Sequence, residues 1–163
     1  MRHLALLTLL CSTTLLGCAG SDEPATSAPS RSAAADATVE AVPIRARISG
    51  DQLAVENQSL SLLDGMQMTQ LGLTERLQEA GFTVDPARHS VVLLSLGEQP
   101  TGGYEARITA LQRKGDLLYV QGTAERPAAD ATTTQQVTYP FSAVVVDKLP
   151  SGLTLRSDIT SRP

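Results

Sequence analysis

Residues 91–123 read VVLLSLGEQPTGGYEARITALQRKGDLLYVQGT, and this stretch decides the fold. It begins with an apolar run of strand length, Val91–Leu96, which is typical of a strand in the interior of a sheet. After a turn, the residues from Tyr104 to Ala110 alternate between apolar and polar side chains, as a half-buried strand does. Lys114-Gly115-Asp116 then forms a second turn before Leu117–Thr123. We therefore expect an interior strand followed by a β-hairpin.

The residues before this stretch predict two more strands and one helix. Partial alternation favours a strand over Val39–Ile48, and a short strand is expected over Gln52–Glu56. Between Thr69 and Ala80 the apolar residues recur with helical spacing. Thr69 is the candidate N-terminal cap of that helix, and Gly81 stands where a C-terminal cap would lie. We expect no other helix in the domain.

The C-terminal residues continue the β pattern. A polar loop is expected over Arg126–Thr134, two strands over Gln135–Asp147 with a break at Pro140, and a short edge strand over Leu153–Arg156. Short antiparallel strands joined by Gly and Pro turns favour a mainly β domain with one helix over residues 38–163. An antiparallel β-sandwich, which includes the immunoglobulin-like form, and a partly open barrel both fit this pattern.

The N-terminal residues, MRHLALLTLLCSTTLLGC, have the order of an export signal. Arg2 precedes a run of 13 apolar and small residues, Leu4–Leu16. A helix needs roughly 20 apolar residues to cross a membrane, so this run is too short to remain as a span. Leu15-Leu16-Gly17-Cys18 resembles the lipobox, in which the cysteine carries the lipid as a thioether. We expect residues 1–17 to be a lipoprotein signal peptide and Cys18 to be the lipidated residue.

The expected mature chain begins with a membrane anchor and a tether. Residues 18–37 are almost entirely small, polar or Pro, so they cannot bury enough surface to fold, and we expect a disordered tether. Cys11 lies within the signal, which leaves no partner for an internal disulfide. In Gram-negative lipoproteins, Asp directly after the lipidated cysteine favours the inner membrane. Ala19 stands there, so the expected location is the cell envelope, with the outer membrane favoured.

Composition disfavours several functional classes. Without residues 1–17 the chain has 12 Lys and Arg against 17 Asp and Glu, a formal charge of −5, which disfavours nucleic-acid binding. His89 is the one remaining histidine and no CxxC pair is present, so we expect no metal site. The sequence offers no convincing catalytic set. We therefore expect no enzyme activity, no catalytic residues and no cofactor, and no small-molecule substrate is evident.

The turn Gln99–Tyr104, with the sequence QPTGGY, is the most distinctive segment. Pro100 fixes φ, and Gly102 and Gly103 permit positive φ, so the chain can reverse tightly between two strands. On composition alone it is a connecting turn. A phosphate-binding loop is disfavoured because no GK[ST] follows and no helix begins here.

This turn and its surroundings resemble the PrcB C-terminal domain family, named after a subunit of a bacterial surface protease complex. The features that carry the resemblance are Val84-Asp85, the strand ending at Gly97, Pro100–Tyr104, the following hairpin, Arg126-Pro127 and Tyr139-Pro140-Phe141. The resemblance implies a protein-binding or complex-stabilising module, not a catalyst. It makes a secreted or surface protease the candidate partner.

A looser similarity runs to chagasin-like cysteine-protease inhibitors, which present an NPTTGY-type loop and an Arg-Pro-aromatic loop. Arg126-Pro127 matches the first two residues of the second loop, but Ala128 replaces the aromatic. Inhibition of a protease is therefore one alternative, and a structural envelope lipoprotein without a specific partner is another. Whether the chain stabilises a complex or inhibits a protease, the expected contact residues are the same. They are Gln99, Pro100, Thr101, Gly102, Gly103, Tyr104, Arg126 and Pro127, and the second loop continues to Asp130.

Overall fold

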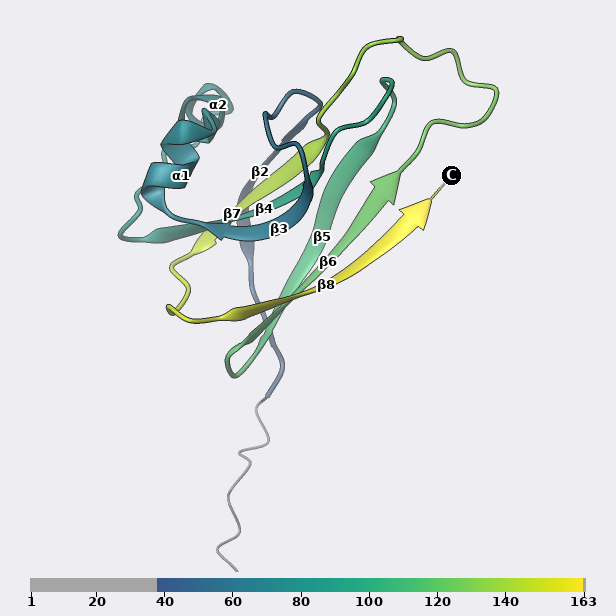
Figure 1. Cartoon of the computed structure of the whole chain (residues 1–163). Coiled ribbons are helices and arrows are strands. Elements are labelled where there is room, and N and C mark those ends of the chain that lie inside the picture. Colours follow the sequence, from purple (N-terminus) through teal and green to yellow (C-terminus); the bar gives the residue numbers. More distant parts are fainter. Residues whose placement is uncertain (1–37, 163) are drawn as a thin grey trace, which may run out of the picture. The chain divides into compact units, whose positions relative to one another are not determined.

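Two helices and eight strands lie within residues 38–162, the part of the chain that the computed structural model describes (Figure 1). The expected signal peptide, Cys18 and the tether lie outside the described residues. The elements in chain order are β1 (Glu40–Ala41), β2 (Ile44–Gly50), β3 (Gln58–Leu63), α1 (Gly65–Gln70), α2 (Leu73–Glu79), β4 (His89–Leu96), β5 (Glu105–Lys114), β6 (Leu117–Glu125), β7 (Phe141–Asp147) and β8 (Thr154–Arg162).

The strands form two four-stranded sheets, in the orders β1-β5-β6-β8 and β2-β7-β4-β3. Every pair is antiparallel except β6–β8, which is parallel. The sheets lie face to face, and the two helices pack on the outer face of the β2-β7-β4-β3 sheet. The expected mainly β sandwich is confirmed. Neither helix of the described residues is long and apolar enough to span a membrane.

The interior strands β4 and β7 contribute to two separate cores. Val92 and Val144 point into the core between the sheets, whereas Val91 and Val145 point into the core beneath the helices. All four side chains are fully buried. A strand covered on both faces needs apolar residues at consecutive positions, which explains the continuous run that identified β4 in the sequence.

The expected helix is two short helices. Asp64 caps α1 through a capping box, in which its side chain accepts from Gln67 N at 2.8 Å and its backbone donates to Gln67 Oε1 at 3.0 Å. Gly72, at φ +63°, then separates α1 from α2. Thr69 therefore lies inside α1 and is not a cap. Gly81, at φ +83°, directly follows the last turn of α2, as the sequence predicted.

The N-terminal strand expectations need correction. Val39–Ile48 is not one strand, because the chain crosses at Val42-Pro43 from the sheet of β1 to the sheet of β2. Gln52–Glu56 is not a strand and forms only an isolated bridge between Gln52 and Tyr139. The strand in this region is β3, whose partly buried Ser and Leu residues made its sequence look less apolar than β4.

The C-terminal expectations also need correction. Gln135–Asp147 contains one strand, β7, while Thr138 makes only an isolated bridge. β8 runs from Thr154 to Arg162, far beyond the short edge strand that was expected. Its mostly exposed, polar residues gave little apolar periodicity to detect.

A β-bulge in β5 shifts the expected alternation. Ala106 and Ile108 are buried as predicted, but the register with β6 shifts between Ile108 and Ala110. Leu111 therefore takes the next buried position in place of Ala110. A bulge adds one residue to a strand and moves the following side chains to the other face.

Candidate functional site

Three loops meet at one end of the sandwich. They are residues 51–57 between β2 and β3, residues 97–104 between β4 and β5, and residues 126–140 between β6 and β7, and together we name them the loop cluster. The expected contact residues all lie in the second and third loops. The first loop was not anticipated as part of the site.

Gly97, the first residue of the second loop, packs against the backbone at the end of the first loop. Its φ is +73°, and a Cβ at this position would lie 2.7 Å from Gln58 N and 2.8 Å from Glu56 O. The next residue, Glu98, donates its backbone N–H to Glu56 O at 3.0 Å. Only glycine fits this close approach of two backbones.

The QPTGGY segment is clamped to the third loop by backbone pairing. Gln99 N donates to Thr138 O at 2.8 Å, and Thr138 N donates to Gln99 O at 2.9 Å. The Thr138 hydroxyl also donates to Thr101 O at 2.8 Å, and Gln99 Nε2 donates to Leu96 O at 3.0 Å. These bonds fix the loop between two interior strands, β4 and β7.

The glycine pair brings QPTGGY into contact with Arg126-Pro127. Gly102 N donates to Thr134 O at 3.0 Å, and a Cβ on Gly102 would collide with the Thr134 hydroxyl. At Gly103, with φ +88°, a Cβ would lie 3.0 Å from Pro127 Cβ. The structure therefore brings the two expected contact loops together. Their role in binding a partner stays a prediction.

The expected contact residues divide into outward and inward positions. Pro100, Gly103 and Arg126 are exposed, and Tyr104 and Pro127 are half-buried. Gln99 and Thr101 are half-buried and Gly102 is buried, so these three hold the loop in shape. A partner would therefore meet the exposed residues first.

Tyr139, in the third loop, forms hydrogen bonds to residues of the other two loops. Its hydroxyl donates to Glu98 Oε2 at 3.2 Å, and its backbone N–H donates to Asp51 O at 2.7 Å. Burial raises the pKa of the Tyr139 phenol above its usual value, and the negative charges of Glu98 and Glu56 raise the pKa further. Tyr139 therefore stays a neutral hydrogen-bond donor under an acidic rim.

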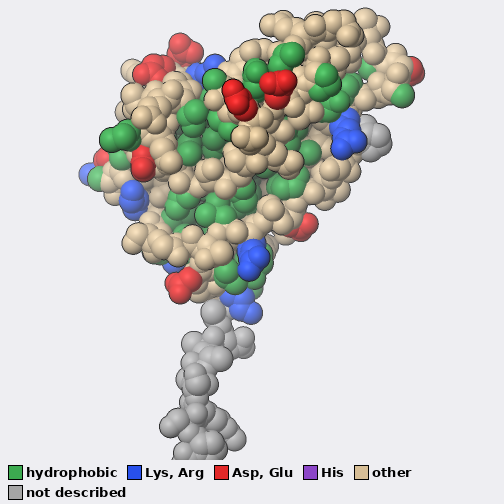
Figure 2. All heavy atoms as spheres, in the orientation of Figure 1, with side chains coloured by type: hydrophobic (Ala, Val, Ile, Leu, Met, Phe, Trp, Pro, Cys, Tyr) green, Lys and Arg blue, Asp and Glu red, His purple; other side chains and the backbone are tan. Residues whose placement is uncertain are grey.

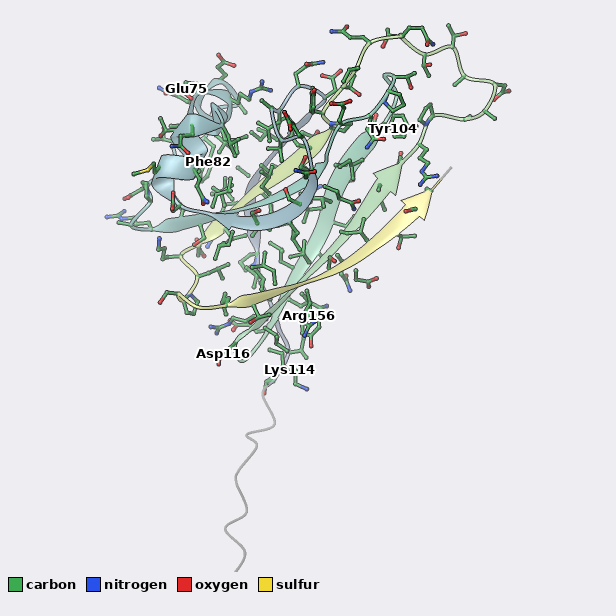
Figure 3. The ribbon with its side chains drawn as sticks, viewed as in Figure 1. Glu75, Phe82, Tyr104, Lys114, Asp116 and Arg156 are labelled. Atoms are coloured by element: carbon green, nitrogen blue, oxygen red, sulfur yellow. The ribbon has the colours of Figure 1, made fainter. Side chains whose placement is uncertain are left out.

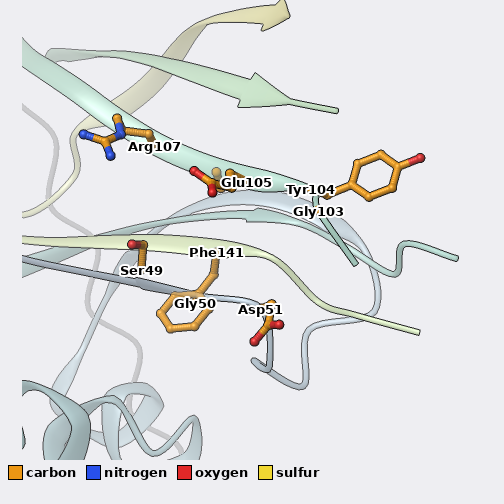
Figure 4. Close-up of a pocket in the computed structure, with 9 residues that line it drawn as sticks. Ser49, Gly50, Asp51, Gly103, Tyr104, Glu105, Arg107 and Phe141 are labelled. Atoms are coloured by element: carbon orange, nitrogen blue, oxygen red, sulfur yellow. The ribbon is translucent and has the colours of Figure 1, made fainter. Parts of the chain in front are cut away.

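A groove of about 460 Å³ continues from the loop cluster along the side of the sandwich (Figure 4). One wall is Gly103 to Arg107, and the other is Ser49 to Asp51 with the Phe141 ring beside Gly50. In Figure 4 the Tyr104 ring points away from Phe141, at the end of the groove next to Gly103. The polar walls suit a peptide more than an apolar small molecule.

His89, the histidine of the described residues, makes contacts that support the fold. His89 Nδ1 accepts a hydrogen bond from Asp85 N at 3.0 Å, and its ring packs edge-on against Phe82 with centroids 5.3 Å apart. The neighbouring Ser90 hydroxyl accepts from Leu149 N at 3.1 Å. Among residues 38–162, no group of three or more His, Cys, Asp or Glu side chains is arranged to hold a metal ion.

Comparison with known proteins agrees with the resemblance seen in the sequence. Residues 90–147 match the family model described as PrcB C-terminal. No curated protein and no solved structure gives a significant match. The matched residues run from β4 to β7 and contain QPTGGY, Arg126-Pro127 and the Thr138 clamp. The chain therefore carries a PrcB C-terminal-like domain, matched over residues 90–147.

Proposed function

We propose that this chain is a lipid-anchored envelope protein that binds a protein partner through the loop cluster and stabilises a complex containing a secreted or surface protease. The observation that carries the proposal is the clamped QPTGGY loop inside the segment that matches the PrcB C-terminal family. The protein acts by binding and not by catalysis.

The physical basis is preorganisation of the contact surface. The paired backbone bonds of Gln99–Thr138 and the single bond from Gly102 N to Thr134 O fix the loop before any partner arrives. A preformed loop loses little conformational entropy on binding, so more of the interaction energy appears as affinity. Pro100 and Arg126 are exposed on this fixed base.

The proposed anchor is a lipid on Cys18, with Ala19 favouring the outer membrane over the inner one. The described chain enters the fold at β1, where Glu40 pairs with Arg113 beside the β5–β6 hairpin. Figure 3 shows Tyr104 and Lys114 at opposite ends of β5. The described chain therefore begins at the hairpin end of the sandwich, away from the loop cluster.

The test captures the partner from envelopes of cells that make the full chain. After chemical crosslinking, we expect one dominant protein from a protease complex to be recovered with the native chain. Arg126→Glu should reduce that recovery, since it reverses an exposed charge in the cluster. Lys114→Glu reverses an exposed charge at the opposite end and is the matched control.

Other outcomes select the alternative functions. Equal recovery with both variants would show that the partner binds elsewhere, and no recovery would favour a structural lipoprotein. Inhibition of a papain-like protease by the purified chain would favour the alternative function as a protease inhibitor. The anchor has its own test: Cys18→Ser should move the protein out of the membrane fraction or block its processing. Unchanged membrane attachment would contradict the lipid proposal without affecting the binding proposal.

A further inference from the structure

β8 has a long open edge. It pairs with β6 on one side and is the last strand in its sheet among the described residues. Thr154 N donates to Asp116 O, and Arg162 O accepts from Arg126 N, so the even-numbered residues direct their backbone groups towards β6. Alternate residues face opposite edges, so Leu155, Ser157 and Ile159 direct theirs outwards. Such an edge is a template for another strand.

We propose that a second copy of this chain binds this edge, with its β8 antiparallel and a two-fold axis at Ser157. In that register Arg156 lies opposite Asp158 of the second copy, and the symmetry repeats the pair. Leu155 lies opposite Ile159 of the second copy on the inner face. The outward backbone groups of Ser157 meet those of Ser157 in the second copy, and those of Leu155 meet those of Ile159, as hydrogen-bonded pairs.

The charges of β8 select this register over its neighbours. An axis at Arg156 would place two arginines opposite each other, and an axis at Asp158 would place two aspartates opposite each other. An axis at Ile159 would bring Arg156 against Arg162. Directly opposed like charges destabilise a strand pair, whereas opposite charges stabilise it. The axis at Ser157 matches both the charged and the apolar positions.

The apolar side of the edge also favours a partner strand. Leu155 and Ile159 are half-buried and pack at the border of the core between the sheets, together with Leu60 and Leu62 of β3. Figure 2 shows hydrophobic side chains gathered on this face, in the region that β3 and β8 border in Figure 1. A second β8 would cover part of this surface, which adds apolar burial to the backbone pairing.

The dimer leaves the loop cluster free, and it is independent of the proposed function. Because the two β8 strands run in opposite directions, the two loop clusters lie at opposite ends of the pair. Each copy therefore keeps an accessible cluster, and failure of the dimer would not bear on partner binding.

Disulfide crosslinking in the full chain tests the register. Ser157→Cys places two thiols at the two-fold axis, where a hydrogen-bonded pair has Cα atoms about 5.5 Å apart, within disulfide range. Thr160→Cys is the control, because its two copies would lie about 20 Å apart at roughly 3.4 Å per residue. Both positions are exposed, so neither change should disturb folding. We expect a disulfide dimer from Ser157→Cys alone. Equal dimer from both variants, or none from either, would overturn the proposal.

A charge exchange in the Ser157→Cys background tests the ion pairs. Arg156→Asp alone or Asp158→Arg alone turns both cross-strand pairs into like-charge pairs, and each should weaken dimerisation about tenfold. The double variant Arg156→Asp/Asp158→Arg restores opposite charges and should restore the dimer. Single variants that crosslink normally, or a double variant as weak as the singles, would contradict this register.

Discussion

Gln99 and Thr138 exchange two backbone hydrogen bonds, of 2.8 and 2.9 Å, although 39 positions of the sequence separate them. Through this bridge the β4–β5 loop and the β6–β7 loop become one rigid unit. The same Thr138 also donates its hydroxyl to Thr101 O. Removing these contacts should loosen the proposed contact surface before it affects the sheets.

Thr138→Val should lower the free energy of unfolding by about 0.5–1.5 kcal/mol, because it removes one hydrogen bond from a buried site while keeping the side-chain shape. The Gln99 amide should also exchange faster with solvent, as local opening of the loop becomes easier. Denaturant unfolding and amide hydrogen exchange measure these effects. Thr160→Val, at an exposed position of β8, is the control and should stay within about 0.5 kcal/mol of the native protein. A loss no greater than that of the control would show that the hydroxyl bond does not hold the loop.

Gly97→Ala should destabilise the protein by about 2–4 kcal/mol, because the new Cβ meets the backbone of residues 56–58 and the positive φ adds strain. Gly152→Ala provides the comparison, since Gly152 has φ +83° but no atom lies within 4 Å of the added Cβ. That variant should cost about 1–2 kcal/mol. Equal losses in thermal unfolding would mean that backbone conformation alone, and not the close approach to the 51–57 loop, requires glycine at position 97.

Tyr139 makes stability fall at high pH. Its pKa is raised in the folded protein by burial and by Glu98 and Glu56, so the unfolded chain loses the phenol proton first. The stability contribution is therefore complete below about pH 10 and is lost as pH rises through the folded pKa. Tyr139→Phe should flatten the stability profile above about pH 10, as measured by denaturant unfolding. Tyr119→Phe is the control; a flattening of the same size there would assign the effect to tyrosines in general.

Asp147 makes stability fall at low pH. Arg45 donates to both of its carboxylate oxygens, at 2.9 and 2.6 Å, and these bonds lower the pKa of Asp147. Because the folded pKa is the lower one, the contribution is present above about pH 4 and is lost as pH falls through the folded value. Arg45→Met should reduce the loss of stability on acidification, and high salt should reduce it in the native protein, since the pair is exposed. An acid profile unchanged by Arg45→Met would contradict this assignment.

Local patterns in the sequence predicted the centre of the fold well. The apolar run of β4 and the turn at Lys114–Asp116 required only neighbouring residues to be interpreted, and both elements are present. The capping box at Asp64 and Gln67 is also a sequence signal for the start of α1, whereas the helical spacing after Thr69 favours a later start. Helix boundaries that depend on such local capping signals can therefore be predicted from the sequence.

Long-range features were not recoverable in the same way. The parallel pairing of β8 depends on where β6 lies, and its polar residues carry no apolar period. The clamp from Thr134 and Thr138 to QPTGGY likewise joins segments that only the fold brings together. The family resemblance did name QPTGGY and Arg126-Pro127 together as expected contact residues, and the structure brings Gly103 next to Pro127.

The most direct test of the central claim is photo-crosslinking from the loop cluster in intact envelopes. A photoreactive phenylalanine analogue replaces Pro100, which is exposed in the cluster, or Lys114, which is exposed at the other end of β5. We predict one dominant adduct from position 100, identified by mass spectrometry as a component of a protease complex, and no such adduct from position 114. The same adduct from both positions, or none from position 100, would contradict the assignment of the loop cluster as the contact surface.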